Sequence, residues 1–276
     1  MPSGPARSFA ALHRPSDPLL LPNAWDVASA RIIEAAGAKA IATTSSGLCW
    51  ALGVRDGNAI PRSQAVAAVR RIVDGVLAPV TADIEGGYGD RTAEDVSETV
   101  RAMVDAGVVG INLEDTPGSD GAPILTPQEQ AQRIAAAREA AQSSGVDLFI
   151  NARTDVFLRA VGDPEHRLDA TLERAEVYLD AGASGIFVPG LTDAETVRAL
   201  ANGIRGPLNI MSGPGKLSLD ELAALGVARI SLGPALALAA YGRVRKMARE
   251  LIVDGKMASL ETDVTFGNMQ DLFPDA

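Results

Sequence analysis

The stretch Asp105-Ala106-Gly107-Val108-Val109-Gly110-Ile111-Asn112-Leu113-Glu114 decides the fold class of this chain. Gly107 follows an amphipathic helical run, where glycine is favoured because it adopts the positive φ of a helix C′ residue without strain. The run that begins at Val108 is short, β-rich and mostly apolar, and it ends in polar residues. The stretch therefore predicts a helix, a glycine turn and a buried strand with a polar carboxyl end.

The same pattern of a helical run, a glycine and a β-rich run recurs at Ala36-Gly37-Ala38, Ala181-Gly182-Ala183 and Leu225-Gly226-Val227. Short β-rich runs alternate with amphipathic helical runs, which is typical of parallel α/β folds. The predicted strands are Leu19–Ala24, Lys39–Ser46, Pro79–Glu85, Val108–Glu114, Asp147–Thr154, Ser184–Pro189, Pro207–Met211 and Ala228–Gly233. The predicted helices are Val27–Ala36, Arg62–Val76, Ala93–Ala106, Pro127–Ser143, Pro164–Ala181, Ala194–Ala201, Leu219–Leu225 and Ala235–Asp254. Eight repeats favour a (β/α)8 TIM barrel, and an open doubly wound sheet is the alternative fold.

The length of 276 residues suits a single barrel, so we expect one barrel domain over residues 1–255. Residues 256–276 form a tail whose apolar side chains need a partner surface. These are Leu260, Phe266, Met269, Leu272 and Phe273. We expect one or two short helices that pack on a neighbouring subunit or on the base of the barrel.

Composition narrows the possible partners. The formal net charge of −10 argues against nucleic acid and anionic membranes. The single cysteine, Cys49, rules out an internal disulfide and fits a reducing cytoplasm. No apolar run is long enough for a membrane span, and the start of the chain lacks a signal core. With His13 and His166 as the only histidines, a zinc site built on imidazoles is nearly excluded.

Polar residues recur at a spacing of two near the predicted carboxyl ends of the strands. They are Thr44, Ser46, Thr81, Asp83, Glu85, Asn112, Glu114, Asn151, Arg153 and Asn209. Residues two apart on a strand share a face, and the active sites of barrels lie at the carboxyl ends of their strands. We therefore expect these side chains to converge inside the mouth of a barrel.

Asp83, Glu85 and Glu114 lie on neighbouring predicted strands, and Arg153 alone does not neutralise three carboxylates. Buried charge is stabilised by pairing or by a metal, and oxygen ligands without histidine favour Mg²⁺, with Mn²⁺ possible. The alternative is a set of solvated carboxylates in surface loops. Asp115 lies on the opposite face of its strand, and Asp155 lies just past a strand end. Both are therefore expected to be helix caps or salt-bridge partners.

Two further features have competing interpretations. Ser45-Ser46-Gly47-Leu48 is either a glycine turn whose backbone N–H groups approach a carboxylate or an ordinary turn. Lys216 is the one lysine near a predicted carboxyl strand end, so a Schiff-base mechanism would require it.

Together these residues resemble the isocitrate lyase/phosphoenolpyruvate mutase superfamily. The resemblance rests on six segments in the family's order and spacing, which cover most of the chain up to the fifth predicted strand. They are Pro22-Asn23-Ala24-Trp25-Asp26, Ser46-Gly47-Leu48, Val54-Arg55-Asp56, Ala82-Asp83-Ile84-Glu85-Gly86-Gly87-Tyr88-Gly89, Leu113-Glu114-Asp115 and Asn151-Ala152-Arg153-Thr154-Asp155.

The resemblance implies a role for each matching residue. Asp83 would bind Mg²⁺ directly, and Glu85, Glu114 and Asp56 would bind it through water. The implied substrate-binding residues are Ser46, Gly47, Leu48, Asp83 and Arg153, to which strand position adds Asn209. Arg153, Asp56 and Glu114 are the expected catalytic residues. The resemblance also implies a homo-oligomer, a dimer or tetramer, with C-terminal helices exchanged between subunits.

The implied activity is a Mg²⁺-dependent carbon–carbon lyase that acts on a small 2-hydroxy or 2-oxo dicarboxylate, such as isocitrate, methylisocitrate or oxaloacetate, through an enolate. The family's lyases carry a Lys-Lys/Arg-Cys-Gly-His loop after the fourth strand, whereas Thr116–Pro123 contains no Cys, Lys or His. Two alternatives therefore stay open: a phosphonopyruvate-type mutase or hydrolase acting on a carbon–phosphorus bond, and a non-catalytic protein that binds a 2-oxo acid.

Overall fold

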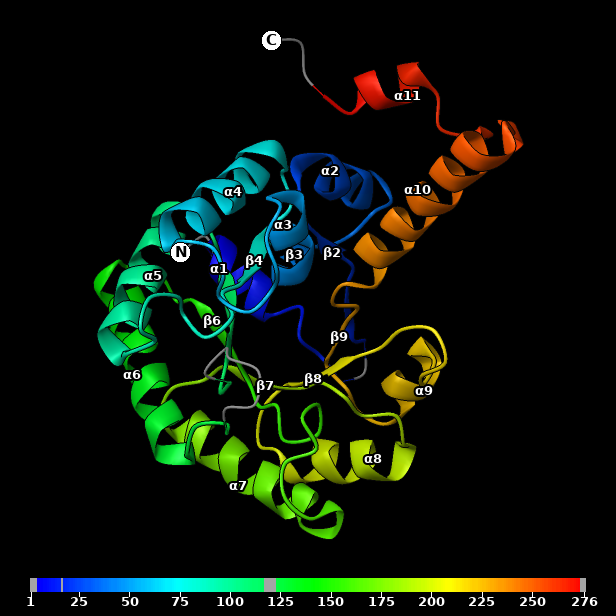
Figure 1. The fold of residues 1–276 in the computed structure, drawn as a ribbon. Helices are drawn as coiled ribbons and strands as arrows, with labels where there is room; N and C mark the ends of the chain where they lie inside the picture. The colour runs from blue at the N-terminus through cyan, green and yellow to red at the C-terminus, as the bar shows by residue number, and fades with distance from the viewer. Residues whose placement is uncertain (1–3, 16, 117–122, 274–276) are drawn as a thin grey trace.

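A computed structural model describes residues 4–15, 17–116 and 123–273 of the chain. In this part, nine parallel strands form one sheet in the order β1-β9-β8-β7-β6-β5-β4-β3-β2 (Figure 1). The strands are β1 (Leu19–Leu21), β2 (Asn23–Ala24), β3 (Ile41–Thr43), β4 (Val80–Asp83), β5 (Gly110–Glu114), β6 (Phe149–Arg153), β7 (Gly185–Val188), β8 (Leu208–Met211) and β9 (Arg229–Ser231). Each predicted strand is present, and β1 and β2 share the first one.

The predicted strand Leu19–Ala24 is divided at Pro22, which has no N–H group to donate to a neighbouring strand. Its first part pairs with β9 and its second part with β3. One segment thus joins the two ends of the sheet, and the strands form the nearly closed barrel of a (β/α)8 fold. The open doubly wound sheet is excluded.

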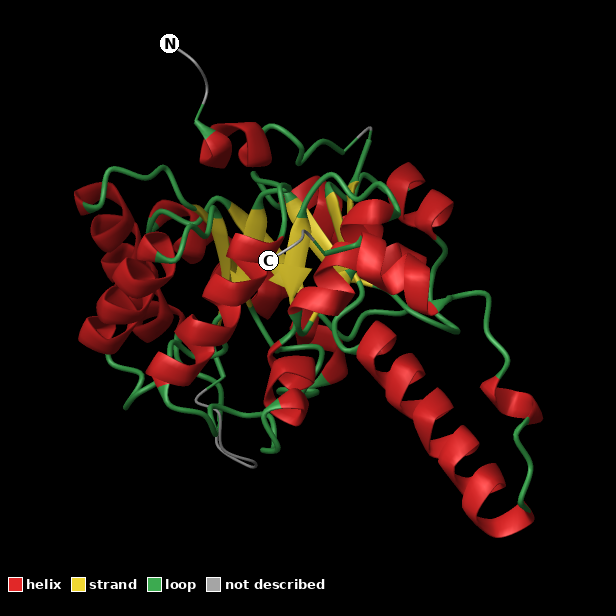
Figure 2. Ribbon diagram, turned by 90° about the horizontal axis from the view of Figure 1, so that it is seen from above, coloured by secondary structure: helices red, strands yellow, loops and turns green. Residues whose placement is uncertain are grey.

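Helices surround the barrel and separate the successive strands from β2 to β9 (Figures 1 and 2). They are α1 (Pro5–Ala10), α2 (Val27–Ala35), α3 (Ser45–Ala51), α4 (Arg62–Gly75), α5 (Ala93–Asp105), α6 (Pro127–Ser143), η1 (Pro164–His166), α7 (Arg167–Asp180), α8 (Ala194–Gly203), α9 (Leu219–Ala224), α10 (Ala235–Asp254), η2 (Ala258–Leu260) and α11 (Phe266–Asp271). The eight predicted helices are confirmed, whereas α1 and α3 were not predicted. Among the described helices, none has both the length and the apolarity that a membrane span needs.

The four glycines that follow predicted helices all adopt positive φ angles. The values are 93° at Gly37, 92° at Gly107, 105° at Gly182 and 88° at Gly226. This conformation ends each helix and turns the chain into the next strand, as the sequence pattern predicted.

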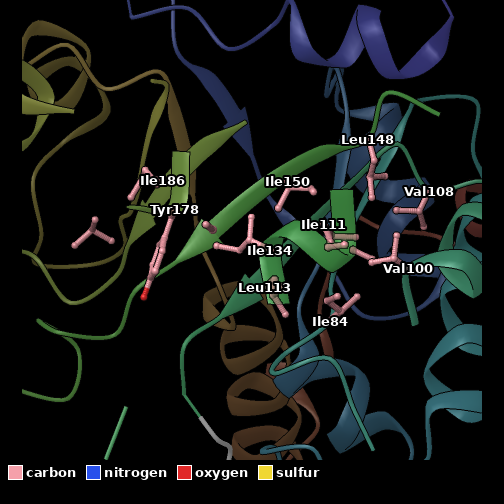
Figure 3. Close-up of a cluster of buried hydrophobic side chains, with 14 of the residues drawn as sticks. Ile84, Val100, Val108, Ile111, Leu113, Ile134, Leu148, Ile150, Tyr178 and Ile186 are labelled. Carbon is pink, nitrogen blue, oxygen red and sulfur yellow. The ribbon is translucent and has the colours of Figure 1, made fainter. Parts of the chain in front are cut away.

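Two apolar clusters position the site. The larger one lies between the strands and the helices around them, and Figure 3 shows Ile84, Ile111 and Leu113 within it. The smaller one lies at the amino ends of the strands, where α1 inserts the fully buried Phe9 beside Phe149. Because α1 covers that end of the barrel, the carboxyl ends of the strands are the side open to a ligand.

The C-terminal arm, which comprises α10, η2 and α11, extends away from the barrel (Figures 1 and 2). Within α10 only Ala237 is buried, and Ile252 and Phe266 are 82% and 80% exposed. The prediction of short helices in the tail is confirmed, and in this single chain their apolar side chains face solvent.

Candidate active site

A cavity of about 520 Å³ lies at the carboxyl ends of the strands. Six of the predicted site residues line it, namely Ser46, Asp56, Asp83, Glu85, Glu114 and Arg153. The carboxylates therefore converge as strand parity predicted, and the alternative of scattered, solvated surface carboxylates does not describe them. Gly47, Leu48 and Asn209 are not among the lining residues.

Asp83 ends β4 and is held by hydrogen bonds to Ser45, Glu85 and Thr43. Its Oδ2 accepts from Ser45 Oγ at 3.0 Å, and its Oδ1 accepts from the Glu85 N–H at 3.3 Å. Its own N–H donates to Thr43 Oγ1 at 2.9 Å. Burial raises the pKa of Asp83, and the opposing charge of Arg153 only partly offsets this. A cation beside Asp83 would favour its ionised form.

Glu85 follows β4 in the left-handed region, with a φ of 50°. Its Oε2 accepts from the N–H of Gly57 at 3.1 Å and from the N–H of Asn58. Burial raises the pKa of Glu85 to about 7, against the effect of the Asn58 hydrogen bond. Asn58 and Tyr88 also have positive φ angles of 60° and 59°, and such backbone strain tends to gather at functional sites.

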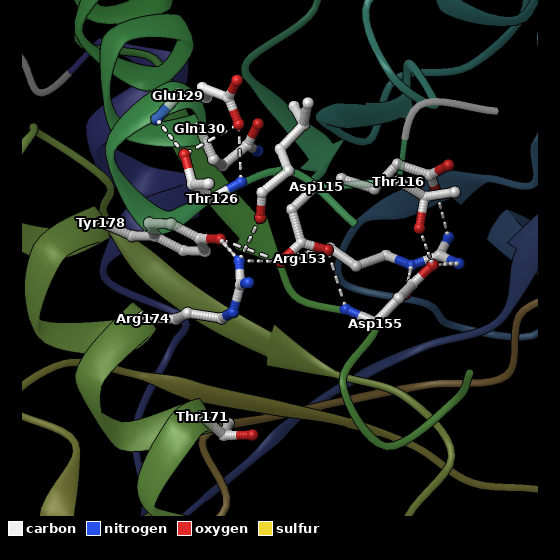
Figure 4. A network of polar contacts seen from close by, with 12 residues as sticks. Asp115, Thr116, Thr126, Glu129, Gln130, Arg153, Asp155, Thr171, Arg174 and Tyr178 are labelled. Carbon is white, nitrogen blue, oxygen red and sulfur yellow. Dashed lines mark hydrogen bonds and ion pairs between the residues drawn. The ribbon is translucent and has the colours of Figure 1, made fainter. Parts of the chain in front are cut away.

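Arg153 joins two carboxylates at the end of β6. Its Nη1 lies 2.7 Å from Glu114 Oε2, and its Nε and Nη2 bind Asp155 at 2.6 and 3.0 Å (Figure 4). Thr116 Oγ1 donates to the same Asp155 carboxylate at 2.7 Å. Burial raises the pKa of Glu114 to about 8 despite Arg153. Burial would lower the pKa of Arg153, but Glu114 and Asp155 raise it above its ordinary value, so Arg153 stays charged.

Cys49 lies closer to the carboxylates than the sequence indicated. Ligand atoms of Cys49, Asp56 and Glu85 all fall within 4.8 Å of one another. Burial, followed by the charge of Glu85, raises the pKa of Cys49 to about 12, so the thiol is neutral. Ser46 Oγ donates to Asp56 Oδ2 at 2.6 Å, and this hydrogen bond orients the Asp56 carboxylate.

Asp115 and Asp155 are salt-bridge partners, as predicted. Asp115 is fully buried on the outer side of the barrel wall, where Arg174 and Tyr178 bind its Oδ2 at 3.2 and 2.9 Å (Figure 4). Its Oδ1 accepts from the N–H of Asp155 at 3.0 Å. This outer network therefore anchors the backbone of the residue that holds Arg153.

The segment around Ser46-Gly47-Leu48 differs from the prediction. The strand ends at Thr43, and the predicted turn is helix α3. A Cβ on Gly47 would lie 2.7 Å from Trp25 Cβ and 3.3 Å from Ala237 Cβ. Glycine is therefore required there for close packing of α3 against Trp25 and α10.

Three other predicted positions are away from the cavity surface or outside the described chain. Asn209 is buried below the cavity, and its Nδ2 has no partner among the described residues. Lys216 does not line the cavity, and its Nζ lies 3.4 Å from the Met211 carbonyl oxygen. Of the segment Thr116–Pro123, residues 117–122 lie outside the described residues.

Sequence reasoning missed Arg159, which follows β6 and lines the cavity. Its guanidinium has no ion-pair partner among the described residues, and its Nη1 is buried without a hydrogen bond. Arg159 lies six residues after Arg153 and beyond the end of the strand. There the alternation of side chains along a strand no longer predicts which way a side chain points. The lining thus contains two guanidinium groups, those of Arg153 and Arg159.

The donor set fits a hard divalent cation. Carboxylates predominate in the cavity, where those of Asp56, Asp83, Glu85, Glu114 and Asp155 outnumber the two guanidinium groups. Burial raises the pKa of Asp83, Glu85 and Glu114, so their ionised forms need a compensating positive charge. Mg²⁺ or Mn²⁺ would supply it, since oxygen atoms are the ligands that these ions prefer.

Comparisons with known proteins identify the family of the chain. The family model described as phosphoenolpyruvate phosphomutase matches residues 9–252. A 2-methylisocitrate lyase of Escherichia coli strain K12 is 30% identical over 211 residues, which are 74% of this chain and 68% of that protein.

Two solved structures from Burkholderia cenocepacia J2315 are also similar. A candidate phosphonomutase is 46% identical, with a TM-score of 0.85 over 88% of this chain and 98% of that chain. A candidate lyase or mutase is 38% identical, with a TM-score of 0.90 over 98% and 96% of the two chains.

Proposed function

The chain belongs to the phosphoenolpyruvate phosphomutase family, within the isocitrate lyase/phosphoenolpyruvate mutase superfamily, and from this premise we propose that it is a Mg²⁺-dependent carbon–carbon lyase. It is an enzyme of the lyase and mutase type that characterises this superfamily. The proposed substrate is a small 2-hydroxy or 2-oxo dicarboxylate, such as isocitrate, methylisocitrate or oxaloacetate. The observation that carries the proposal is the convergence of Asp56, Asp83, Glu85, Glu114 and Arg153 on one cavity.

In this proposal Asp83 would bind Mg²⁺ directly, and Asp56, Glu85 and Glu114 would hold it through water. Bound Mg²⁺ would supply Lewis-acid stabilisation of the negative charge that develops on a 2-oxo group. Asp83 is suited to its role because Ser45 Oγ and the Glu85 N–H orient its carboxylate. Glu85 is oriented in turn by the backbone N–H groups of Gly57 and Asn58.

The chain's own residues bind the substrate anion. In the first turn of α3 the Ser45 N–H donates to Asp83, whereas the N–H groups of Ser46 and Gly47 have no backbone acceptor among the described residues and are available to a carboxylate. Arg153 stays charged beside Glu114 and is available to pair with substrate oxygens. Arg159 lines the same cavity and has no carboxylate partner among the described residues, which favours a substrate with a second acidic group.

Incubation with Mg²⁺ and each of isocitrate, methylisocitrate and oxaloacetate tests the proposal directly. We expect cleavage of at least one of these compounds, with loss of turnover when Mg²⁺ is chelated. A matched reaction with Arg153→Lys, which keeps the charge but not the bidentate fork, should be slower. Absence of carbon–carbon cleavage with all three substrates would overturn the lyase assignment.

Action on a carbon–phosphorus bond is the second candidate, and the 46% identity to a candidate phosphonomutase favours it. Phosphonopyruvate separates the two activities. Release of phosphate or isomerisation to phosphoenolpyruvate, without cleavage of the dicarboxylates, would identify the second candidate as the activity.

We also propose that the protein is a cytoplasmic homo-oligomer, a dimer or tetramer, in which the C-terminal arm packs on another copy of the chain. The exposed apolar side chains of α10 and α11 support this, because such surfaces usually mark an interface. The arm extends away from its own barrel, so a second copy is the partner we assign to it.

A further inference from the structure

Asn112 forms part of the floor of the cavity. It lies on β5, with Asp83 of β4 and Asn151 of β6 as its register partners. It lines the cavity while being only 5% exposed. The family resemblance assigned no role to Asn112, although it lies directly beside the residue proposed to bind the metal.

Two donors meet at the same oxygen of Asn112. Asn151 Nδ2 donates to Asn112 Oδ1 at 2.9 Å, and Arg229 Nη2 donates to it at 3.1 Å. A carboxamide that rotates by half a turn exchanges its oxygen and nitrogen. A guanidinium has donors only, so Arg229 selects the orientation in which the oxygen faces it.

The nitrogen of the Asn112 amide must then face the other way. Among the described residues it has no hydrogen-bond partner. It is also not one of the fully buried polar atoms that lack a partner, so it retains some accessible surface. Since Asn112 lines the cavity, the Nδ2 donor is directed into it. The floor of the cavity therefore presents an N–H₂ group beside the carboxylate of Asp83.

Arg229 is a buried cation that contacts Asn112 and is also stabilised by the charge of Asp83. It is 1% exposed inside the barrel, and it has no ion-pair partner among the described residues. Among the described residues its guanidinium makes one hydrogen bond, from Nη2 to Asn112, and its Nε and Nη1 are buried without partners. A buried cation is energetically unfavourable, so its retention at this position fits a role in orienting Asn112.

We propose that Asn112 is a ligand-binding residue, whose amide donates to an oxygen of the substrate, and that Arg229 is the positioning residue that fixes this amide. The proposal rests on the proposed function, because it places a carboxylate or 2-oxo oxygen of the substrate over Asn112. The expected effect is that of one hydrogen bond, an affinity change of about 3- to 10-fold.

The test measures the binding of oxalate by calorimetry in the presence of Mg²⁺. Oxalate is a planar dicarboxylate that chelates Mg²⁺ through adjacent oxygens, as a 2-oxo acid does. We expect Asn112→Ala and Arg229→Met each to weaken binding by about 3- to 10-fold. Arg229→Lys should restore most of the affinity, because its ammonium still donates to Oδ1. Thr81→Val is the matched control, since Thr81 Oγ1 is buried inside the barrel without a partner.

A double-mutant cycle separates positioning from a merely structural role. If Arg229 acts through Asn112, the variant with both Asn112→Ala and Arg229→Met should bind oxalate as weakly as Asn112→Ala alone. Thermal unfolding should show that Arg229→Met is folded, because an apolar side chain replaces a buried cation that has no ion-pair partner within 4.0 Å among the described residues. The proposal would be overturned if the affinity loss of the double variant equalled the product of the two single-variant losses. It would also be overturned if either single variant bound oxalate as tightly as the wild type.

Failure of the proposed function gives a different result. If the wild-type protein with Mg²⁺ binds no oxalate, the metal and 2-oxo acid site itself is wrong, and the role of Asn112 falls with it. If the wild type binds oxalate and Asn112→Ala binds it equally well, only the inference about Asn112 and Arg229 is overturned.

Discussion

Glu114 and Asp115 are consecutive in the chain, yet their carboxylates lie on opposite sides of the barrel wall. Glu114 faces the cavity and lies 2.7 Å from Arg153 Nη1, while Asp115 faces the surrounding helices and lies 3.2 Å from Arg174 Nη1. Each carboxylate is buried with its own arginine. The inner pair belongs to the candidate site, and the outer pair attaches α7 to the end of β5.

Removal of the outer arginine should destabilise the fold. In Arg174→Leu, Asp115 keeps the hydroxyl of Tyr178 but loses its cation, and we expect the free energy of unfolding to fall by about 3 kcal/mol. Urea denaturation measures this. Arg205→Leu is the control, because Arg205 forms an exposed pair with Asp180 and its loss should leave the midpoint unchanged. Equal midpoints for the two variants would contradict the role of the outer pair.

Replacement of the proposed direct metal ligand should abolish metal binding. Asp83→Asn keeps the shape of the side chain but removes its charge. We expect a loss of Mn²⁺ affinity beyond the roughly 10- to 100-fold that follows loss of an outer-shell partner. The electron paramagnetic resonance signal of free Mn²⁺ measures binding. Asp105→Asn, at an exposed position at the end of α5, is the matched control, and equal affinity of the two variants would exclude Asp83 as a ligand.

The stability of the metal-free protein should fall as the pH rises. The pKa of Glu85 is raised to about 7 and that of Glu114 to about 8, both above the ordinary value of 4.5. Between pH 4.5 and 8 the folded chain therefore holds more protons at Glu85 and Glu114 than the unfolded chain, and these two groups make stability decrease with pH, against the smaller opposite effect of the single His13, whose pKa burial lowers. In the proposed site Mg²⁺ would bind the ionised carboxylates, so it should raise the melting temperature mainly at the alkaline end. Melting curves at about pH 5 and about pH 8, with Mg²⁺ or with a chelator, test this. A metal-free protein that melts higher at the alkaline pH would refute it.

Arg159 should discriminate between substrates by their second acidic group. Loss of a hydrogen bond to a charged group corresponds to a change of about 10- to 100-fold. We expect Arg159→Leu to weaken binding of oxaloacetate by this factor and to leave pyruvate binding nearly unchanged. Calorimetry with Mg²⁺ compares the two ligands, and Arg198→Leu, an exposed arginine on α8, serves as control. An equal loss for both ligands would show that Arg159 does not contact the second carboxylate.

We expect the C-terminal arm to form the contact between copies of the chain in the proposed oligomer. Ile252→Asp combined with Phe266→Asp places charges on side chains that are 82% and 80% exposed in the single chain. If these residues pack on another copy, light scattering should detect a smaller species than the wild type. Leu77→Asp is the control, because Leu77 is 96% exposed in a loop of the barrel. An unchanged mass of the double variant would remove the arm from the interface.

The local pattern of the sequence was sufficient for the repeating fold and for the convergence of the carboxylates. Gly107 and its three counterparts end helices because positive φ is a property of a single residue. Asp83 and Glu114 point into the cavity because alternation along a strand sets their faces. Neither inference needed knowledge of distant contacts.

The tertiary structure alone decided the features that depend on residues far apart in the chain. Pairing of the first segment with both β9 and β3 divided it at Pro22. Contact of α3 with Trp25 and Ala237 required Gly47, where the sequence had left open an anion-binding turn or an ordinary turn. The bond between Arg229 and Asn112 joins residues 117 positions apart. Such contacts follow from the closure of the barrel and the register of its strands, which the spacing of residues within one strand does not specify.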